Sequence, residues 1–217
     1  MRAAVAILIL ASAAHAQEVP PVSRIALDPS RGAEIGDVYQ AWLSPHQQGG
    51  EEEDTPGLVP SQFRSTEESV PRAERTSRGH GTLAFTRDLS KAYVHLKIEN
   101  VVPSEINMFH IHCGRPGQLG PILVDFGLVG EVATFFADGE VSLEIDNALI
   151  VATSAADNGL VDAFTSGCPI IPLIPTDKVK TVAGMAQIAA ERELYFNLHT
   201  TRQTYFGDIR GQLYPVE

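Results

Sequence analysis

Two histidines stand two residues apart in the segment NMFHIHCG, residues 107–114. If that segment is a β-strand, His110 and His112 project from the same face, because side chains alternate between the two faces of a strand. A third histidine, His199, lies near the end of the apolar segment ELYFNLHT and falls on its polar face. Neutral imidazole rings are favoured ligands of transition metals, so three of them at strand ends predict a metal site.

Arg210 is a second candidate functional residue, within the segment DIRGQL. A hairpin joins its strand to that of His199, so the two side chains are expected to be neighbours on the outer face. A strand arginine can equally form an ion pair with Asp208 or Asp125 that covers the sheet, and the residues alone leave both roles open.

The chain has two cysteines, Cys113 and Cys168. In an exported protein such a pair most often forms a disulfide. The alternative is that Cys113, which follows His112 directly, serves as a metal ligand or a redox thiol.

From residue 79 onward, short segments of alternating apolar and polar residues are separated by turn residues, which predicts β-strands with one buried face. An all-β fold is therefore expected, an antiparallel sandwich or barrel. One short helix is predicted between Asp177 and Arg192, where apolar residues recur at three- and four-residue spacing. The predicted strands lie in GHGTLAFTR, AYVHLKIENV, INMFHIH, PILVDFG, EVATFFADGEVSLEI, ELYFNLHT and DIRGQLYPV.

The N-terminal third of the chain lacks this regular alternation. Residues 1–16 combine an early arginine, an apolar run and the small-residue ending Ala-His-Ala, which is typical of a secretory signal peptide cleaved after Ala16. Residues 17–78 are expected to form an irregular, partly disordered arm, and the acidic run at 46–57 a solvated loop. The sandwich domain is assigned to residues 79–217.

Charge and hydropathy exclude two classes of partner. The formal net charge is -11 and no cluster of lysine or arginine occurs, so neither nucleic acid nor an anionic membrane surface is an expected partner. No segment after the signal peptide is long and apolar enough to span a bilayer. The mature protein is therefore expected in the periplasm or the extracellular medium.

Two motifs of this sequence resemble those of a known family. HIHCGRPGQLGP is similar to the HIH-x-G-x-x-G-x-x-G-P motif of the CHRD (chordin) domain, which is widespread in secreted bacterial proteins. ELYFNLHTTRQTYFGDIRGQ is similar to that domain's C-terminal YxNxHT…GxIRGQ motif. The resemblance covers roughly residues 79–214, with an expected insertion at about 160–175.

A more distant resemblance implies a particular metal. One strand carrying His110 and His112, a late His199 and a following Arg210 are similar in order to the copper half of Cu/Zn superoxide dismutases, which are Greek-key β-sandwiches. That likeness implies three copper ligands and, for Arg210, a role in guiding an anion. No histidine stands between His112 and His199, so the zinc-binding loop is missing. The resemblance implies one copper per chain and no zinc.

Four further side chains are candidates for a fourth ligand: Met108, His80, His95 and Asp208. Met108 is on the face of the histidine pair, and its thioether would favour Cu(I). The alternative for Met108 is a packing role, and for His80 and His95 an exposed position at the surface.

Three functions of different classes are consistent with these residues. The first is an exported copper-binding protein that acts as carrier, store or sensor. The second is a copper oxidoreductase of the superoxide dismutase type, in which Arg210 would be the anion-facing catalytic residue. The third is an interaction module without metal. The first ranks highest, because a net charge of -11 repels superoxide and unfilled histidine clusters are costly.

The signal peptide gives the first testable prediction. Expressed from the full sequence in an exporting host, the mature protein is expected to begin at Gln17, as determined by intact mass and N-terminal sequencing. Ala16→Lys should block cleavage, because the site requires a small residue. A mature chain that retains residues 1–16 would contradict the prediction.

Overall fold

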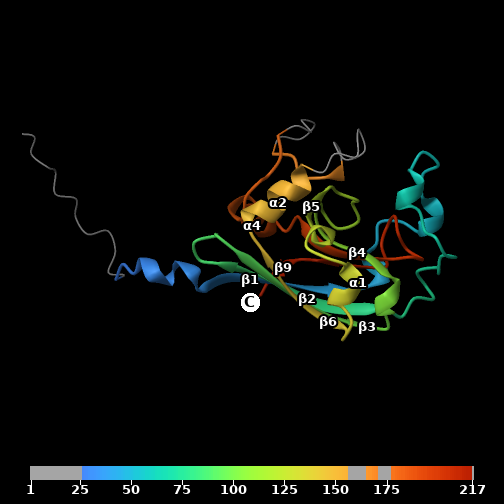
Figure 1. The fold of residues 1–217 in the computed structure, drawn as a ribbon, viewed down its shortest axis with the longest axis horizontal. Coiled ribbons are helices and arrows are strands. Elements are labelled where there is room, and N and C mark those ends of the chain that lie inside the picture. The colour runs from blue at the N-terminus through green and yellow to red at the C-terminus, as the bar shows by residue number, and fades with distance from the viewer. Residues whose placement is uncertain (1–25, 156–164, 171–176, 217) are drawn as a thin grey trace, which may run out of the picture.

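The computed structural model describes residues 26–155, 165–170 and 177–216. Over these residues the chain forms two antiparallel β-sheets that pack face to face, with short helices at their margins (Figure 1). The expected signal peptide lies outside the described residues, as does most of the expected insertion.

The first sheet has five strands in the order β6-β3-β2-β1-β9. Its central strands follow the predicted alternation, since every second residue of β3 is buried and the residues between are exposed. One face therefore packs on the core and the other meets solvent. The strands are β1 (Ile35–Leu43), β2 (Arg78–Thr86), β3 (Ala92–Glu99), β6 (Glu140–Ile145) and β9 (Tyr214–Pro215).

The second sheet has four strands in the order β5-β4-β7-β8. Its inner face carries the large apolar residues of the core, such as Phe109, Phe196 and Leu198, which are fully buried. Its outer face is buried as well, because β7 and β8 have no exposed residue. The strands are β4 (Ile106–Cys113), β5 (Ile122–Asp125), β7 (Leu194–Thr200) and β8 (Ile209–Gln212).

The connections between the sheets confirm the predicted Greek-key sandwich. β3 and β6 are neighbours in the first sheet, although β4 and β5, which separate them in sequence, pair with each other in the second. This crossover brings β4 next to β7, so that Met108 and His199 are register partners.

The expectation of one helix was wrong. The segment EVATFF, predicted as strand, forms the helical turn α1 (Val132–Phe135), because Val132 and Phe136 are four residues apart and both point into the core. Helix α2 (Asn147–Ser154) was not predicted. The predicted helix is α4 (Val182–Ala190), which begins after the N-cap Thr181.

Helices α2 and α4 lie side by side next to β5 (Figure 1), and the side chain of Asn147 accepts a hydrogen bond from the first amide of α4. Among the described residues, no helix has the length and apolar character needed to cross a membrane. Short 3-10 turns complete the structure at Pro29–Ala33, Pro45–Gln47, Glu52–Asp54, Ser61–Phe63, Pro103–Glu105 and Phe126–Leu128.

Residues assigned from sequence to an N-terminal arm are part of the sandwich. β1 pairs with both β2 and β9 inside the first sheet. The chain then crosses to the second sheet, where Gln48 donates a hydrogen bond to the side chain of Asn197 and Thr66 to the carbonyl of Thr201. Residues 44–77 thus cover the outer face of that sheet, and we call them the covering segment.

The acidic run in this segment is not the solvated loop that its composition predicts. The carboxylate of Glu52 is buried and accepts hydrogen bonds from the amides of Tyr205 and Phe206 and from the hydroxyl of Ser65. Composition alone could not reveal this, because the three donors come from other parts of the chain.

Glu52 should therefore be important for stability. Glu52→Ala removes the acceptor of three hydrogen bonds and is expected to lower the free energy of unfolding by about 2 kcal/mol, measured by urea denaturation. The matched variant Glu53→Ala changes an exposed neighbour and should cost under about 0.5 kcal/mol. Equal losses in the two variants would rule out the anchoring role.

Candidate metal centre

The three predicted histidines converge on one point of the second sheet. His110 and His112 lie on β4 and His199 on the adjacent β7, all on the outer face. Their ring centroids are separated by 5.3 Å, 5.1 Å and 6.2 Å. Each residue is at most 4 % exposed, because the covering segment and the loop after β4 close over this face.

Each imidazole contacts a protein oxygen through one ring nitrogen, and for His112 and His199 the contact is a hydrogen bond. Nδ1 of His112 donates to the carbonyl of Gly120 at 2.8 Å, and Nδ1 of His199 donates to the carbonyl of Thr204 at 2.9 Å. Because a carbonyl only accepts, these bonds fix the tautomer with Nδ1 protonated. Nε2 of His110 faces the carboxylate of Asp125 at 3.4 Å.

The other nitrogen of each ring is buried without a hydrogen-bond partner. These atoms are Nδ1 of His110 and Nε2 of His112 and His199. A buried polar atom left unpaired costs about 1–3 kcal/mol, so three in one cluster need an explanation. A metal ion that accepts the three lone pairs would remove this cost, and the bonds to Gly120, Thr204 and Asp125 would then orient the ligands.

The spacing of these nitrogens can be compared with what one ion requires. One ring nitrogen of each histidine lies within 4.8 Å of those of the other two. Three nitrogens bound to one ion at about 2.0–2.1 Å in tetrahedral or trigonal geometry are about 3.3–3.6 Å apart. Ring rotations that bring the nitrogens about 1 Å closer together would place the three in range of a single ion.

The protonation state also suits metal binding. Burial, followed by the neighbouring histidines, holds the pKa of His112 well below its usual value. The pKa of His199 is lowered to about 3, again mainly by burial and then by His110. Both rings are therefore neutral near pH 7, and a metal displaces no proton from them.

The loop after β4 positions His112. Gly120, whose carbonyl binds this histidine, lies so close to the strand that a Cβ atom there would be 1.7 Å from the carbonyl oxygen of Cys113. In the same loop Gly117 has a φ of 78°, a conformation that favours glycine, whereas Gly120 is required for close approach.

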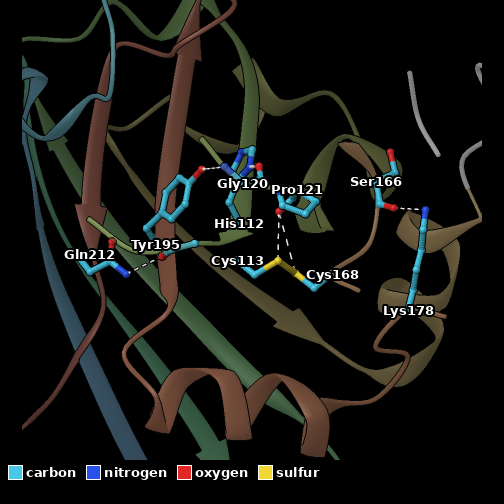
Figure 2. The surroundings of a disulfide bond; sticks show 10 residues. His112, Cys113, Gly120, Pro121, Ser166, Cys168, Lys178, Tyr195 and Gln212 are labelled. Atoms are coloured by element: carbon cyan, nitrogen blue, oxygen red, sulfur yellow. Dashed lines mark hydrogen bonds between the residues drawn. A yellow bond between two sulfur atoms is a disulfide. The ribbon is translucent and has the colours of Figure 1, made fainter. Parts of the chain in front are cut away.

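The predicted disulfide is present. Cys113 is bonded to Cys168, and Figure 2 shows the bond beside the carbonyl of Pro121. Cys113 is therefore neither a metal ligand nor a free thiol. The disulfide instead ties the end of β4 to a segment 55 residues away in sequence.

Arg210 does not face the histidines. Its guanidinium carbon lies 3.4 Å above the ring of Tyr195, which is itself stacked on His112 with ring centroids 4.9 Å apart. Because β7 lies between β4 and β8, the tyrosine separates the arginine from the histidine. The guanidinium donates to the carbonyls of Gln118 and Arg115 and thereby holds the loop after β4.

Neither predicted alternative partner of Arg210 is used. Asp125 faces His110, and Asp208 is 3.5 Å from Arg75 and accepts a hydrogen bond from Ser77.

Of the four candidates for an additional ligand, the structure brings one to the cluster. Met108 lines the same pocket as the three histidines. His80 stacks on Trp42 in the first sheet at 3.9 Å, and His95 in that sheet contacts Ser142. Asp208 is held by Arg75 and Ser77, away from the cluster.

The histidines form the floor of a pocket of about 320 Å³. Most of its wall is apolar, and five lining residues come from the covering segment, which the sequence predicts to be part of an irregular, partly disordered arm. The remaining lining residues are Pro56, Leu58, Val59, Pro60, Phe63, Met108, Leu119, Gly120, Ile122, Thr165, Thr204 and Tyr205.

Sequence reasoning missed two kinds of supporting group. Tyr195 shares the face of His199, and its position in the alternation was a usable signal. The carbonyls of Gly120 and Thr204 carried none, because every residue has a carbonyl and only the fold selects these two.

The class of the protein follows from fold and site together: an antiparallel Greek-key sandwich with a buried three-histidine cluster on one sheet. A scan against family models matched the CHRD domain over residues 61–213. The chain therefore belongs to the CHRD family, and the match begins within the covering segment. Searches of curated proteins and of solved structures found no match.

The lowered pKa values predict an acid-sensitive fold. Below pH 6.5 the unfolded chain protonates His199 while the folded chain does not until about pH 3. Metal-free protein should therefore lose stability as pH falls through this window, by up to about 1.4 kcal/mol per pH unit for this residue.

Urea denaturation with a chelator, at pH 7 and pH 5, measures this loss. His199→Gln should lose roughly 2 kcal/mol less than the wild type over that interval. The control His95→Gln alters an exposed histidine and should match the wild type. A His199→Gln variant as acid-sensitive as the wild type would contradict the assignment.

Proposed function

We propose that this CHRD protein is exported and binds one copper ion through His110, His112 and His199, acting as a carrier, store or sensor of copper. The observation that carries the proposal is the set of three buried imidazole nitrogens without a hydrogen-bond partner, on histidines whose ring nitrogens lie within 4.8 Å of one another. Hydrogen bonds to the opposite ring nitrogens are the second shell that metal-bound histidines commonly have.

Copper is favoured over zinc by the donor set. Three neutral imidazoles bind Cu(II) more tightly than Zn(II) in the usual order of divalent affinities. Met108 adds a thioether to the same pocket, and this soft donor favours Cu(I). A site that accommodates both oxidation states suits a protein that takes up and releases copper.

Export is supported by the disulfide and the N-terminal sequence. Cys113–Cys168 is the kind of bond that forms in the periplasm or outside the cell. Residues 1–16 have the pattern of a signal peptide.

The alternatives gain less support. An oxidoreductase acting on superoxide would need a cation facing the metal, and Arg210 lies behind Tyr195 instead. An interaction module without metal would leave the three nitrogens uncompensated.

Metal analysis after loading and dialysis tests the proposal. The wild type is expected to retain one copper per chain from an equimolar mixture of Cu(II) and Zn(II), with nitrogen couplings in the copper EPR spectrum. His112→Ala together with His199→Ala should abolish retention, since one imidazole cannot hold the ion.

The double variant His80→Ala with His95→Ala is the matched control, because it removes two histidines outside the cluster and should retain a full equivalent. Circular dichroism establishes that both double variants are folded. Equal retention by the two, or retention of zinc in place of copper, would refute the proposal.

A further inference from the structure

We propose that the pocket above the histidines binds a small apolar molecule that carries one neutral nitrogen or oxygen donor. The donor would occupy the open position of the metal, and the apolar body would lie against the covering segment. This inference rests on the proposed function and names the class of ligand for the same site.

The geometry of the sheet fixes where the open position lies. His110, His112 and His199 all rise from the outer face of two adjacent strands, so they would hold an ion from the side of the sheet. Any further ligand must approach from the opposite side. That side is the pocket of about 320 Å³, a volume near the lower end of small-molecule sites.

The wall of the pocket disfavours charged ligands. Among the described residues that line it, none is an aspartate, glutamate, lysine or arginine, and the covering segment supplies Leu58, Val59 and Phe63. A hydrated anion would lose water against these apolar side chains, and only the metal itself would offset that cost, since Arg210 is behind Tyr195. An apolar body would gain by leaving water.

Hydrogen bonds hold the wall of the pocket in place. Arg64 donates hydrogen bonds from its guanidinium to the carbonyls of Pro56 and Val59, each at 2.9 Å, and so clamps the two ends of the turn. Glu52 anchors the preceding residues to the loop after β7. Leu58 is 98 % exposed and marks the mouth through which a ligand enters.

Two probes with the same donor test the inference. Copper-loaded full-length protein is titrated with imidazole and with 4-phenylimidazole, and both affinities are read from the copper EPR spectrum. The ratio of the two affinities for the protein is divided by the same ratio for aqueous Cu(II). The corrected ratio is expected to favour 4-phenylimidazole roughly tenfold or more, because the pocket buries its phenyl ring.

Variants of the wall link this preference to the pocket. Phe63→Ala should reduce the ratio of the two affinities severalfold. The control Phe135→Ala changes another half-buried phenylalanine, in α1, and should leave the ratio unchanged. Val59→Phe narrows the pocket and should weaken 4-phenylimidazole while leaving imidazole unchanged. Copper content is measured in every sample.

The outcomes separate the two proposals. Equal affinities of the probes, or ratios unaffected by both wall variants, would overturn the ligand class while retained copper leaves the metal site standing. A wild type that retains no copper would overturn the metal site and this inference with it.

Discussion

The burial of three imidazoles with one ring nitrogen bound and the other free is the constraint on which the rest of this structure depends. Carbonyl oxygens of two loops fix the tautomers of His112 and His199, and the carboxylate of Asp125 orients His110. The three rings lie close together, with one ring nitrogen of each within 4.8 Å of those of the other two. A protein that buried these atoms for packing alone would carry three uncompensated polar groups.

That arrangement requires a sheet covered on both faces. The inner face of β4 and β7 packs on the apolar core, and the outer face holds the histidines under residues 44–77. The cover is anchored by polar contacts, chiefly the buried carboxylate of Glu52 and the pair of Gln48 with Asn197. The same segment thus helps to remove the histidines from bulk water, and this burial lowers the pKa values of His112 and His199. It also forms part of the apolar wall of the pocket.

The resemblance to copper dismutases implied where the three histidines lie and also what Arg210 does, and these two expectations have different outcomes. The histidines meet as their order along the chain implied, yet the arginine that follows them serves the scaffold. It stacks on Tyr195 and holds the carbonyls of the loop that orients His112. Arg210 therefore supports the cluster from behind, and most of the pocket wall in front of the histidines is apolar.

The sequence by itself determined the all-β fold and the shared face of His110 and His112, and it allowed a single cysteine pairing without showing that the bond forms. These rest on local rules, since alternation along a strand assigns each side chain to a face and two cysteines allow one pairing. The tertiary structure alone decided that EVATFF is helical, that β1 joins the first sheet and that Glu52 is buried. It also decided where Arg210 points. In each case the partner lies far away in the sequence, and no local pattern encodes a contact that only folding brings together.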